Sequence, residues 1–239
     1  MYDIYDLSPL KRQWLLRTSN IPRRFLGLGI EDVIEKTGAF PDDVKNWIDD
    51  ALSGEIIRQI GNISINGVGL LFDGGPGIGK TTHAVVAAME FIRRLPDDPE
   101  AMAPILRMEP KDISPATRPI YYTTYPEFLS YKKSSFDLEP DEKRELTYKL
   151  DGLHGRSKYD HLNTRILVID DLGKEYGSKY DDSTFDEILR LRYDKGLPTI
   201  VTTNVKLENW ESTYSEAMQS FAKEAFYRVP IVSGDLRGA

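Results

Sequence analysis

The sequence predicts an α/β fold in which helices cover both faces of a parallel β-sheet. Short apolar runs alternate along the chain with segments whose apolar residues recur at helical spacing. The runs are short and rich in apolar, β-branched and aromatic residues, which is typical of strands that are buried on both faces. Polar residues follow three of them, at Asp73, Asp170 and Asn204. Because such sheets bind ligands at the carboxyl ends of their strands, these residues mark the expected edge of a site.

The individual elements follow from the same patterns. Strand character is found in residues 68–72, 120–124, 165–169, 199–203 and 229–232. Helical spacing is found in residues 30–37, 41–53, 81–94, 127–133, 183–195 and 215–227. A further helix is expected to start at Ser8, with Pro9 in its first turn.

Two connections between these elements are long. Residues 95–119 contain five prolines before Pro119 and no clear period, so we expect an irregular excursion there. Residues 134–163 carry Lys and Glu at helical spacing around residues 143–149. Each connection is either specialised for function or a decorative insertion.

Composition excludes several classes of protein. The 239 residues are 40% hydrophobic and 29% charged, as in an ordinary globular chain that forms one large domain or one domain with a small appendage. The chain has no cysteine, which excludes disulfides, thiol nucleophiles and cysteine-based zinc fingers. It has no apolar run of 18 residues and no signal-peptide pattern, so we expect a cytoplasmic protein without a membrane partner.

The net charge of −7 argues against coating of nucleic acid by bulk positive charge. Most of this charge comes from residues 31–55, which hold eight acidic residues and two lysines. The remainder of the chain is nearly neutral, and a local basic groove is left open.

Residues 74–81, GGPGIGKT, fit the phosphate-binding pattern G-x-x-x-x-G-K-S/T between a predicted strand and a predicted helix. Glycines let backbone N–H groups curl around phosphate oxygens, and the helix N-terminus favours negative charge. Lys80 is expected at the β- and γ-phosphates and the Thr81 hydroxyl at Mg²⁺. The expected nucleotide-binding residues are Gly75, Pro76, Gly77, Ile78, Gly79, Lys80, Thr81 and Thr82.

Two later strands end in residues that complete such a site. Asp170 would hold Mg²⁺ through water, and Asp171 would orient or deprotonate the attacking water, although an aspartate reaches less far than a glutamate. Asn204 has an amide that suits both the γ-phosphate and the attacking water, and the alternative is a turn-forming asparagine.

The strings GGPGIGKT, LVIDDLGKE and IVTTN, in this order and spacing, resemble the AAA+ ATPases and, within them, the DnaC-type bacterial and phage helicase loaders. SNIPRRF and YYTTYPEFL are similar to further segments of that group, so the resemblance covers roughly residues 19–237. It implies a three-layer P-loop NTPase with a five-stranded parallel sheet, ATP with Mg²⁺, and nucleotide-dependent self-association. It also implies a role in placing a replicative helicase on single-stranded DNA.

Three more residues follow from the resemblance. Glu175 matches the extended second motif and is the next candidate for the catalytic base. Arg228, in AFYRV, resembles the finger that reaches the γ-phosphate of a neighbouring subunit, and Arg237, in SGDLRG, resembles the sensor-2 arginine. Without the resemblance, both arginines are surface or salt-bridging residues.

The resemblance also suggests how the chain is divided. Residues 21–239 are the expected ATPase domain, with a minimal or absent C-terminal lid because the motif around Arg237 lies two residues from Ala239. Residues 1–20 are an expected helical extension. Its apolar residues Leu10, Trp14 and Leu15 either contact a partner such as the helicase or pack onto the chain's own core.

Single-stranded DNA would contact residues 131–133 and 154–159, where cations and aromatic residues interleave. Acidic residues balance the basic ones between residues 128 and 160, so this segment is no basic patch by charge alone. Two other functions stay open. One is an ATPase that helps transposition, and the other is a nucleotide-binding adaptor with little turnover.

Overall fold

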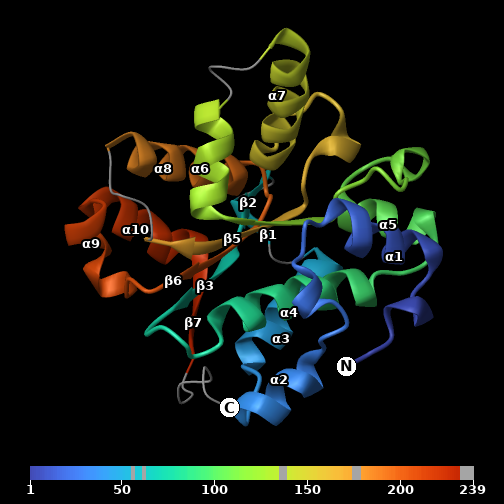
Figure 1. Ribbon diagram of the computed structural model, residues 1–239, viewed down its shortest axis with the longest axis horizontal. Helices are drawn as coiled ribbons and strands as arrows, with labels where there is room; N and C mark the ends of the chain where they lie inside the picture. The colour runs from blue at the N-terminus through green and yellow to red at the C-terminus, as the bar shows by residue number, and fades with distance from the viewer. Residues whose placement is uncertain (55–56, 61–62, 135–138, 174–178, 232–239) are drawn as a thin grey trace.

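A computed structural model describes residues 1–54, 57–60, 63–134, 139–173 and 179–231. Its centre is a five-stranded sheet in the order β4-β5-β6-β3-β7, and every neighbouring pair is parallel (Figure 1). The strands are β3 (Gly69–Asp73), β4 (Ile120–Thr124), β5 (Ile166–Leu172), β6 (Thr199–Thr203) and β7 (Phe226–Pro230). The predicted parallel sheet is confirmed.

Helices cover both faces of this sheet, which gives three layers (Figure 1). One face packs against α1 (Pro9–Gln13), α2 (Ile30–Thr37), α3 (Asp42–Ser53), α4 (Lys80–Arg94) and α5 (Pro99–Leu106). The other packs against α6 (Tyr125–Ser134), α7 (Pro140–His154), α8 (Lys179–Asp194), α9 (Trp210–Thr213) and α10 (Glu216–Ala225). Because successive strand residues face opposite sides, Leu70 and Phe72 enter the first core and Leu71 enters the second.

The strand at the chain's C-terminal end differs most from its prediction. β7 begins at Phe226, three residues before the predicted start, directly where α10 ends at Ala225. Phe226 and Val229 are buried while Tyr227 and Arg228 are exposed, because this strand lies at the edge of the sheet. A half-exposed strand lacks a continuous apolar run, so its first residues read as helix in the sequence.

The prediction of an irregular segment over residues 95–119 is wrong in part. The segment contains α5, which starts with Pro99 and is capped by the Asp98 carboxylate through a 3.1 Å bond from the Ala101 N–H. Met102 and Leu106 are buried in the core. Proline is compatible with the first turn of a helix because the amide hydrogen it lacks has no partner there, so the number of prolines concealed this helix.

A second feature was not predicted. β1 (Ile57–Ile60) and β2 (Ile63–Gly67) form an antiparallel pair separate from the main sheet, and β2 contacts α8. Gly67 also packs closely against the turn that follows α8, since a Cβ at this position would lie 2.6 Å from the backbone of Gly196 and Leu197. The pair therefore joins α3 to β3 across the surface of α8.

The apolar residues near the N-terminus belong to the core of the molecule. α1 continues as a π-helix over Trp14–Thr18, and Trp14 and Leu15 are buried in the first core. The Trp14 indole N–H donates to the Ser114 carbonyl at 2.8 Å, and the Ser19 carbonyl accepts from the Tyr122 N–H at 2.8 Å. Of the two alternatives for these residues, packing onto the chain's own core is the one that the structure supports.

Candidate nucleotide site

The phosphate-binding loop connects β3 to the N-terminus of α4, as the motif predicts. Gly77 and Gly79 have φ angles of 84° and 88°, in the left-handed region that favours glycine, and Gly79 is the N-cap of α4. A side chain at either position would strain the loop. The loop and the first turn of α4 line a cavity of about 480 Å³, a volume that suits a nucleotide.

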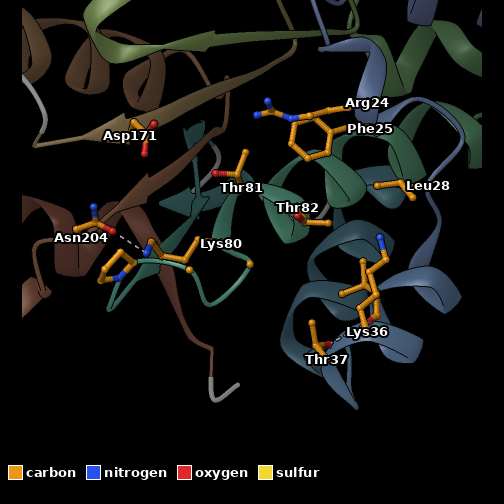
Figure 2. Close-up of a pocket in the computed structure, with 14 residues that line it drawn as sticks. Arg24, Phe25, Leu28, Lys36, Thr37, Lys80, Thr81, Thr82, Asp171 and Asn204 are labelled. Atoms are coloured by element: carbon orange, nitrogen blue, oxygen red, sulfur yellow. Dashed lines mark hydrogen bonds between the residues drawn. The ribbon is translucent and has the colours of Figure 1, made fainter. Parts of the chain in front are cut away.

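Lys80 joins this loop to the end of β6. Its side-chain nitrogen donates to the Gly74 and Gly75 carbonyls at 2.9 and 2.6 Å and to the Asn204 Oδ1 atom at 2.8 Å (Figure 2). Lys80 is only 8% exposed. Two residues that lie 124 positions apart in the chain, and that the sequence predicts in one site, are therefore in direct contact.

Thr81 and Asp170 meet on the other side of the loop. The Thr81 hydroxyl donates to Asp170 Oδ1 at 2.8 Å, and the Thr202 hydroxyl donates to the same oxygen at 2.5 Å. Hydroxyl and carboxylate oxygens are ligands that Mg²⁺ accepts, and Mg²⁺ usually keeps several waters. The pair therefore fits a magnesium site, although the described residues contain no cluster of three or more histidine or carboxylate side chains arranged to hold a metal.

Tyr122 and Thr202 hold Asp170 in place and were missed in the sequence. The Tyr122 hydroxyl donates to Asp170 Oδ2 at 2.7 Å. Burial, and then the nearby Asp170 charge, raise the pKa of Tyr122, so its phenol remains a donor at neutral pH. Both residues lie within predicted strands, and the only sequence signal is a polar group inside an apolar run.

Asp171 has an unusual backbone. Its φ of +60° lies in the left-handed region, and the register between β5 and β6 shifts between Ile169 and Leu172. The Asp171 N–H donates to the Thr202 hydroxyl at 3.1 Å, which supports this conformation. Asp171 lines the nucleotide cavity (Figure 2), whereas the preceding residue, Asp170, is buried. A left-handed residue other than glycine is strained, and such strain is frequent at functional sites.

The far wall of the cavity comes from an earlier part of the chain. Arg24 and Phe25, from the short 3₁₀ helix Arg23–Phe25, lie across the cavity from Asn204 and Asp171 (Figure 2). Leu28 and α2 extend this wall. It combines apolar and cationic groups, which suits the base and sugar of a nucleotide whose phosphates lie at the loop. In the sequence, the only signal for Arg24 and Phe25 is that they end the segment SNIPRRF, which resembles a segment of the loader group.

Arg228 lies outside this cavity, in a neighbouring hollow on the other side of the loop. Its guanidinium donates to both carboxylate oxygens of Asp73, at 3.0 and 2.8 Å, and to both oxygens of Glu208. Asp73 is 4% exposed and also accepts from the Leu207 N–H at 2.8 Å. The bonds to Asp73 and then Glu208 raise the pKa of Arg228. Arg228 thus holds β7 to the start of the phosphate-binding loop within one chain.

The other predicted residues have different outcomes. Glu175 and Arg237 lie outside the described residues. Lys132 and Arg156, from the two expected DNA-binding segments, are side by side, since both bind Glu187, at 3.2 and 2.5 Å. Bonds from Arg156 and then Lys132 lower the pKa of Glu187.

Within the part of the chain that the structure describes, no helix has the length and apolar character needed to cross a membrane.

Comparisons with known proteins agree with this architecture. No protein-family profile and no curated protein sequence matches the chain. The solved structure of DnaI matches with a TM-score of 0.59 and 18% identity, over 95% of this chain and all of that chain. A DnaC helicase loader matches with a TM-score of 0.51 and 19% identity, over 88% of this chain and all of that chain. AMPPCP-bound DnaA from Aquifex aeolicus matches with a TM-score of 0.52 and 16% identity, over 92% of this chain and 54% of that chain.

The chain has the fold of the AAA+ P-loop proteins, with the phosphate-binding loop, Asp170 and Asn204 at one edge of the sheet. This fold extends over the whole of the DnaI and DnaC structures. The resemblance to DnaC-type loaders that the three motifs indicated is thus confirmed for the fold.

Proposed function

We propose that this chain is a Mg²⁺-dependent ATPase that helps to load a replicative helicase onto single-stranded DNA, as a nucleotide-dependent oligomer in the cytoplasm. The observation that carries the proposal is the convergence of Lys80, Thr81, Asp170 and Asn204, in a fold that covers DnaI and a DnaC helicase loader over their full length. The parallel sheet brings the three strand ends to one edge, but it does not dictate that a lysine, a hydroxyl, a carboxylate and an amide follow them.

The contacts of Lys80 suggest how ATP is received. In the nucleotide-bound state its ammonium group would leave the Gly74 and Gly75 carbonyls for the β- and γ-phosphates, while Asn204 stays within reach of the γ-phosphate. Thr81 and Asp170 would hold Mg²⁺, the latter through water. When bound, Mg²⁺ neutralises charge on the phosphates.

Asp171 is proposed to orient or deprotonate the attacking water, because it lines the cavity and its backbone is held by Thr202. Glu175 is the next candidate for this role. Arg237 is proposed to close on the nucleotide. A role of Arg228 toward a neighbouring subunit would require its release from Asp73 and Glu208.

The first test measures ATP hydrolysis by the chain alone, with single-stranded DNA, with the host's replicative helicase, and with both. Hydrolysis that responds to helicase and DNA is the expected result. Tight ATP binding without hydrolysis in any mixture would instead favour a nucleotide-binding adaptor. A response to a transposase in place of the helicase would favour a transposition helper.

Helicase contact through residues 1–20 is tested in the full chain, since deleting this segment would remove Trp14 and Leu15 from the core. Tyr5 and Leu16 are 68% and 47% exposed, so they are available to a partner. Tyr5→Ala/Leu16→Ala should weaken capture of the helicase, whereas the control Tyr148→Ala, at a similarly exposed tyrosine on α7, should not. Equal capture by both variants would remove the N-terminal segment from the proposed interface.

A further inference from the structure

A second cavity lies at the opposite edge of the sheet, beside the amino ends of β5 and β6. Its volume is about 450 Å³. It is bounded by the end of α5, the loop after α7 and the turn between α8 and β6. The polar residues that line it are Arg107, Ser157, Asn163, Arg165, Asp194 and Lys195. Three of these six are cations and one is an acid.

Arg165 is the innermost of these cations. It is 2% exposed, and among the described residues its guanidinium makes one hydrogen bond, from Nη1 to the Gly196 carbonyl at 2.6 Å. Burial and then the neighbouring Arg107 charge lower the pKa of Arg165 to about 9, so it is still a cation at neutral pH. Its remaining donors, on a residue that lines the cavity, are available to a ligand.

A second buried cation lies behind it. Arg192 is fully buried and donates to four carbonyl oxygens and to the Thr199 hydroxyl. One of these carbonyls belongs to Arg165, at 3.2 Å. These bonds occupy the N–H donors of the guanidinium, but none of the acceptors carries a negative charge. Arginine is rarely buried without an acidic partner, so two such residues in contact leave an excess of positive charge beneath the cavity.

The rim of the cavity adds two more cations. Arg107 donates to the Lys195 carbonyl at 3.2 Å, and the Lys195 ammonium donates to the Gly155 carbonyl at 2.6 Å. Asp194 forms no ion pair within 4.0 Å of these cations in the described part of the chain. With three cations and one acid, the lining of the cavity carries an excess of positive charge.

Ser157 offers a neutral donor on the same rim. Its hydroxyl oxygen accepts from the Tyr159 N–H at 3.2 Å, which leaves the hydroxyl proton for a ligand. Asn163 fixes this part of the wall through two reciprocal bonds with the Ser157 backbone, each 3.0 Å long. The donors around the cavity therefore approach from several directions, from Arg107, Arg165, Lys195 and Ser157.

We propose that this cavity is an anion site that binds a phosphoryl group. A tetrahedral phosphate accepts hydrogen bonds from several directions, and guanidinium groups bind it through paired donors. The volume exceeds that of one phosphate, so the group belongs either to a free polyphosphate or to the backbone of a single-stranded nucleic acid. The site is distinct from the nucleotide cavity and does not depend on the proposed function.

The test uses pyrophosphate and isothermal titration calorimetry at low salt. Wild-type protein should bind two pyrophosphates per chain. Lys80→Ala removes the ammonium group of the phosphate-binding loop and should leave one. In that background, Arg107→Ala/Lys195→Ala should weaken the remaining site at least tenfold, because both cations line the cavity. The matched control is Lys143→Ala/Arg144→Ala, which removes two exposed cations from α7 and should leave the affinity unchanged.

Two results would overturn the proposal: no pyrophosphate bound by the Lys80→Ala protein, or an equal loss of affinity in the control variant. Melting temperatures confirm that each variant is folded. Arg165→Lys, which keeps the buried charge but removes the planar donor pair, gives an independent measure and should also weaken binding. An unlabelled oligo(dT) that displaces pyrophosphate would identify a nucleic-acid backbone as the source of the phosphate. Failure to displace it would identify a free polyphosphate.

Discussion

The two edges of the sheet differ in how their arginines are paired. At the carboxyl edge, the guanidinium of Arg228 faces the carboxylates of Asp73 and Glu208, and Asp170 lies among three hydroxyl donors. At the amino edge, Arg165 and Arg192 bind carbonyl and hydroxyl groups alone among the described residues. A buried ion needs hydrogen-bond partners and a group of opposite charge. A carbonyl oxygen accepts hydrogen bonds from an arginine, but it does not neutralise the charge of the guanidinium.

Helix geometry explains why the amino edge tolerates this excess. α5, α7 and α8 all end beside the second cavity, where Arg107, Gly155 and Asp194 line it. The C-terminus of a helix carries a partial negative charge that favours cations, by about 0.3–1 kcal/mol at an exposed site. The following experiments separate the two edges.

The largest effect is expected at Asp171. Asp171→Asn keeps the shape of the side chain but removes its basicity, so ATP turnover should fall by about 10²–10³-fold. ATP affinity should stay within about threefold of wild type, because binding rests on Lys80 and the loop. Turnover is measured by phosphate release and affinity by calorimetry. Retained turnover would transfer the role of base to another residue, and Glu175→Gln would be the next variant. Pyrophosphate binding at the amino edge should not change.

Lys80→Ala should weaken ATP binding by about 100-fold, because it removes the charged donor at the β- and γ-phosphates. Calorimetry with Mg²⁺ and ATP measures this loss. Lys111→Ala is the control and should bind ATP as wild type does, because Lys111 is an exposed residue of the 3₁₀ helix Pro110–Asp112 and does not line the nucleotide cavity. An affinity within threefold of wild type for Lys80→Ala would contradict the assignment of this cavity to ATP.

Arg228→Ala should lower the free energy of unfolding by about 2 kcal/mol, because Asp73 is then buried with the Leu207 N–H as its one remaining hydrogen-bond donor among the described residues. Urea denaturation measures the change. The double variant Asp73→Asn/Arg228→Ala should recover part of it, since no buried charge is then left unpaired.

The same variant tests action between subunits. Mixing Arg228→Ala with Asp171→Asn should restore ATP hydrolysis only if Arg228 reaches the site of a neighbouring chain. A loss of stability without restored hydrolysis would assign Arg228 to the ion pair within its own chain alone.

Local patterns were enough to predict much of the carboxyl edge. The phosphate-binding loop, Asp170 and Asn204 lie at the ends of apolar strands, and parallel strands bring their carboxyl ends to one edge of a sheet. The contacts of Lys80 with Asn204 and of Thr81 with Asp170 agree with this reasoning. The roles of these residues in catalysis remain predictions.

The amino edge gave no comparable signal in the sequence. Arg107 follows α5, Arg165 precedes β5 and Arg192 lies in α8, so their proximity depends on how α5 and α8 pack beside β5. Their side chains also look like ordinary surface arginines in the sequence. Tyr122 was missed for a related reason, because its contact with Asp170 depends on the register between β4 and β5.

The smallest effect is expected at Glu187, an exposed residue of α8 that holds Lys132 and Arg156 together. Glu187→Gln removes the charge that neutralises them, so affinity for fluorescent oligo(dT) should rise about threefold and fall more steeply with salt. Fluorescence anisotropy at several salt concentrations measures both. Lys132→Ala should act in the opposite direction, and Glu211→Gln, at an exposed position on α9, is the neutral control.

The pH dependence of this effect has a definite sign. Because the two cations lower the pKa of Glu187, its carboxylate stays charged when the pH falls from 7 to 5. The ratio of the oligo(dT) affinity of Glu187→Gln to that of the wild type should therefore stay constant over that range. It should approach one only at lower pH, where wild-type Glu187 also becomes neutral. Equal affinities at pH 7, with equal salt slopes, would show that DNA does not contact these cations. Single-stranded DNA would then have to bind elsewhere, and competition with pyrophosphate would show whether it binds at the second cavity.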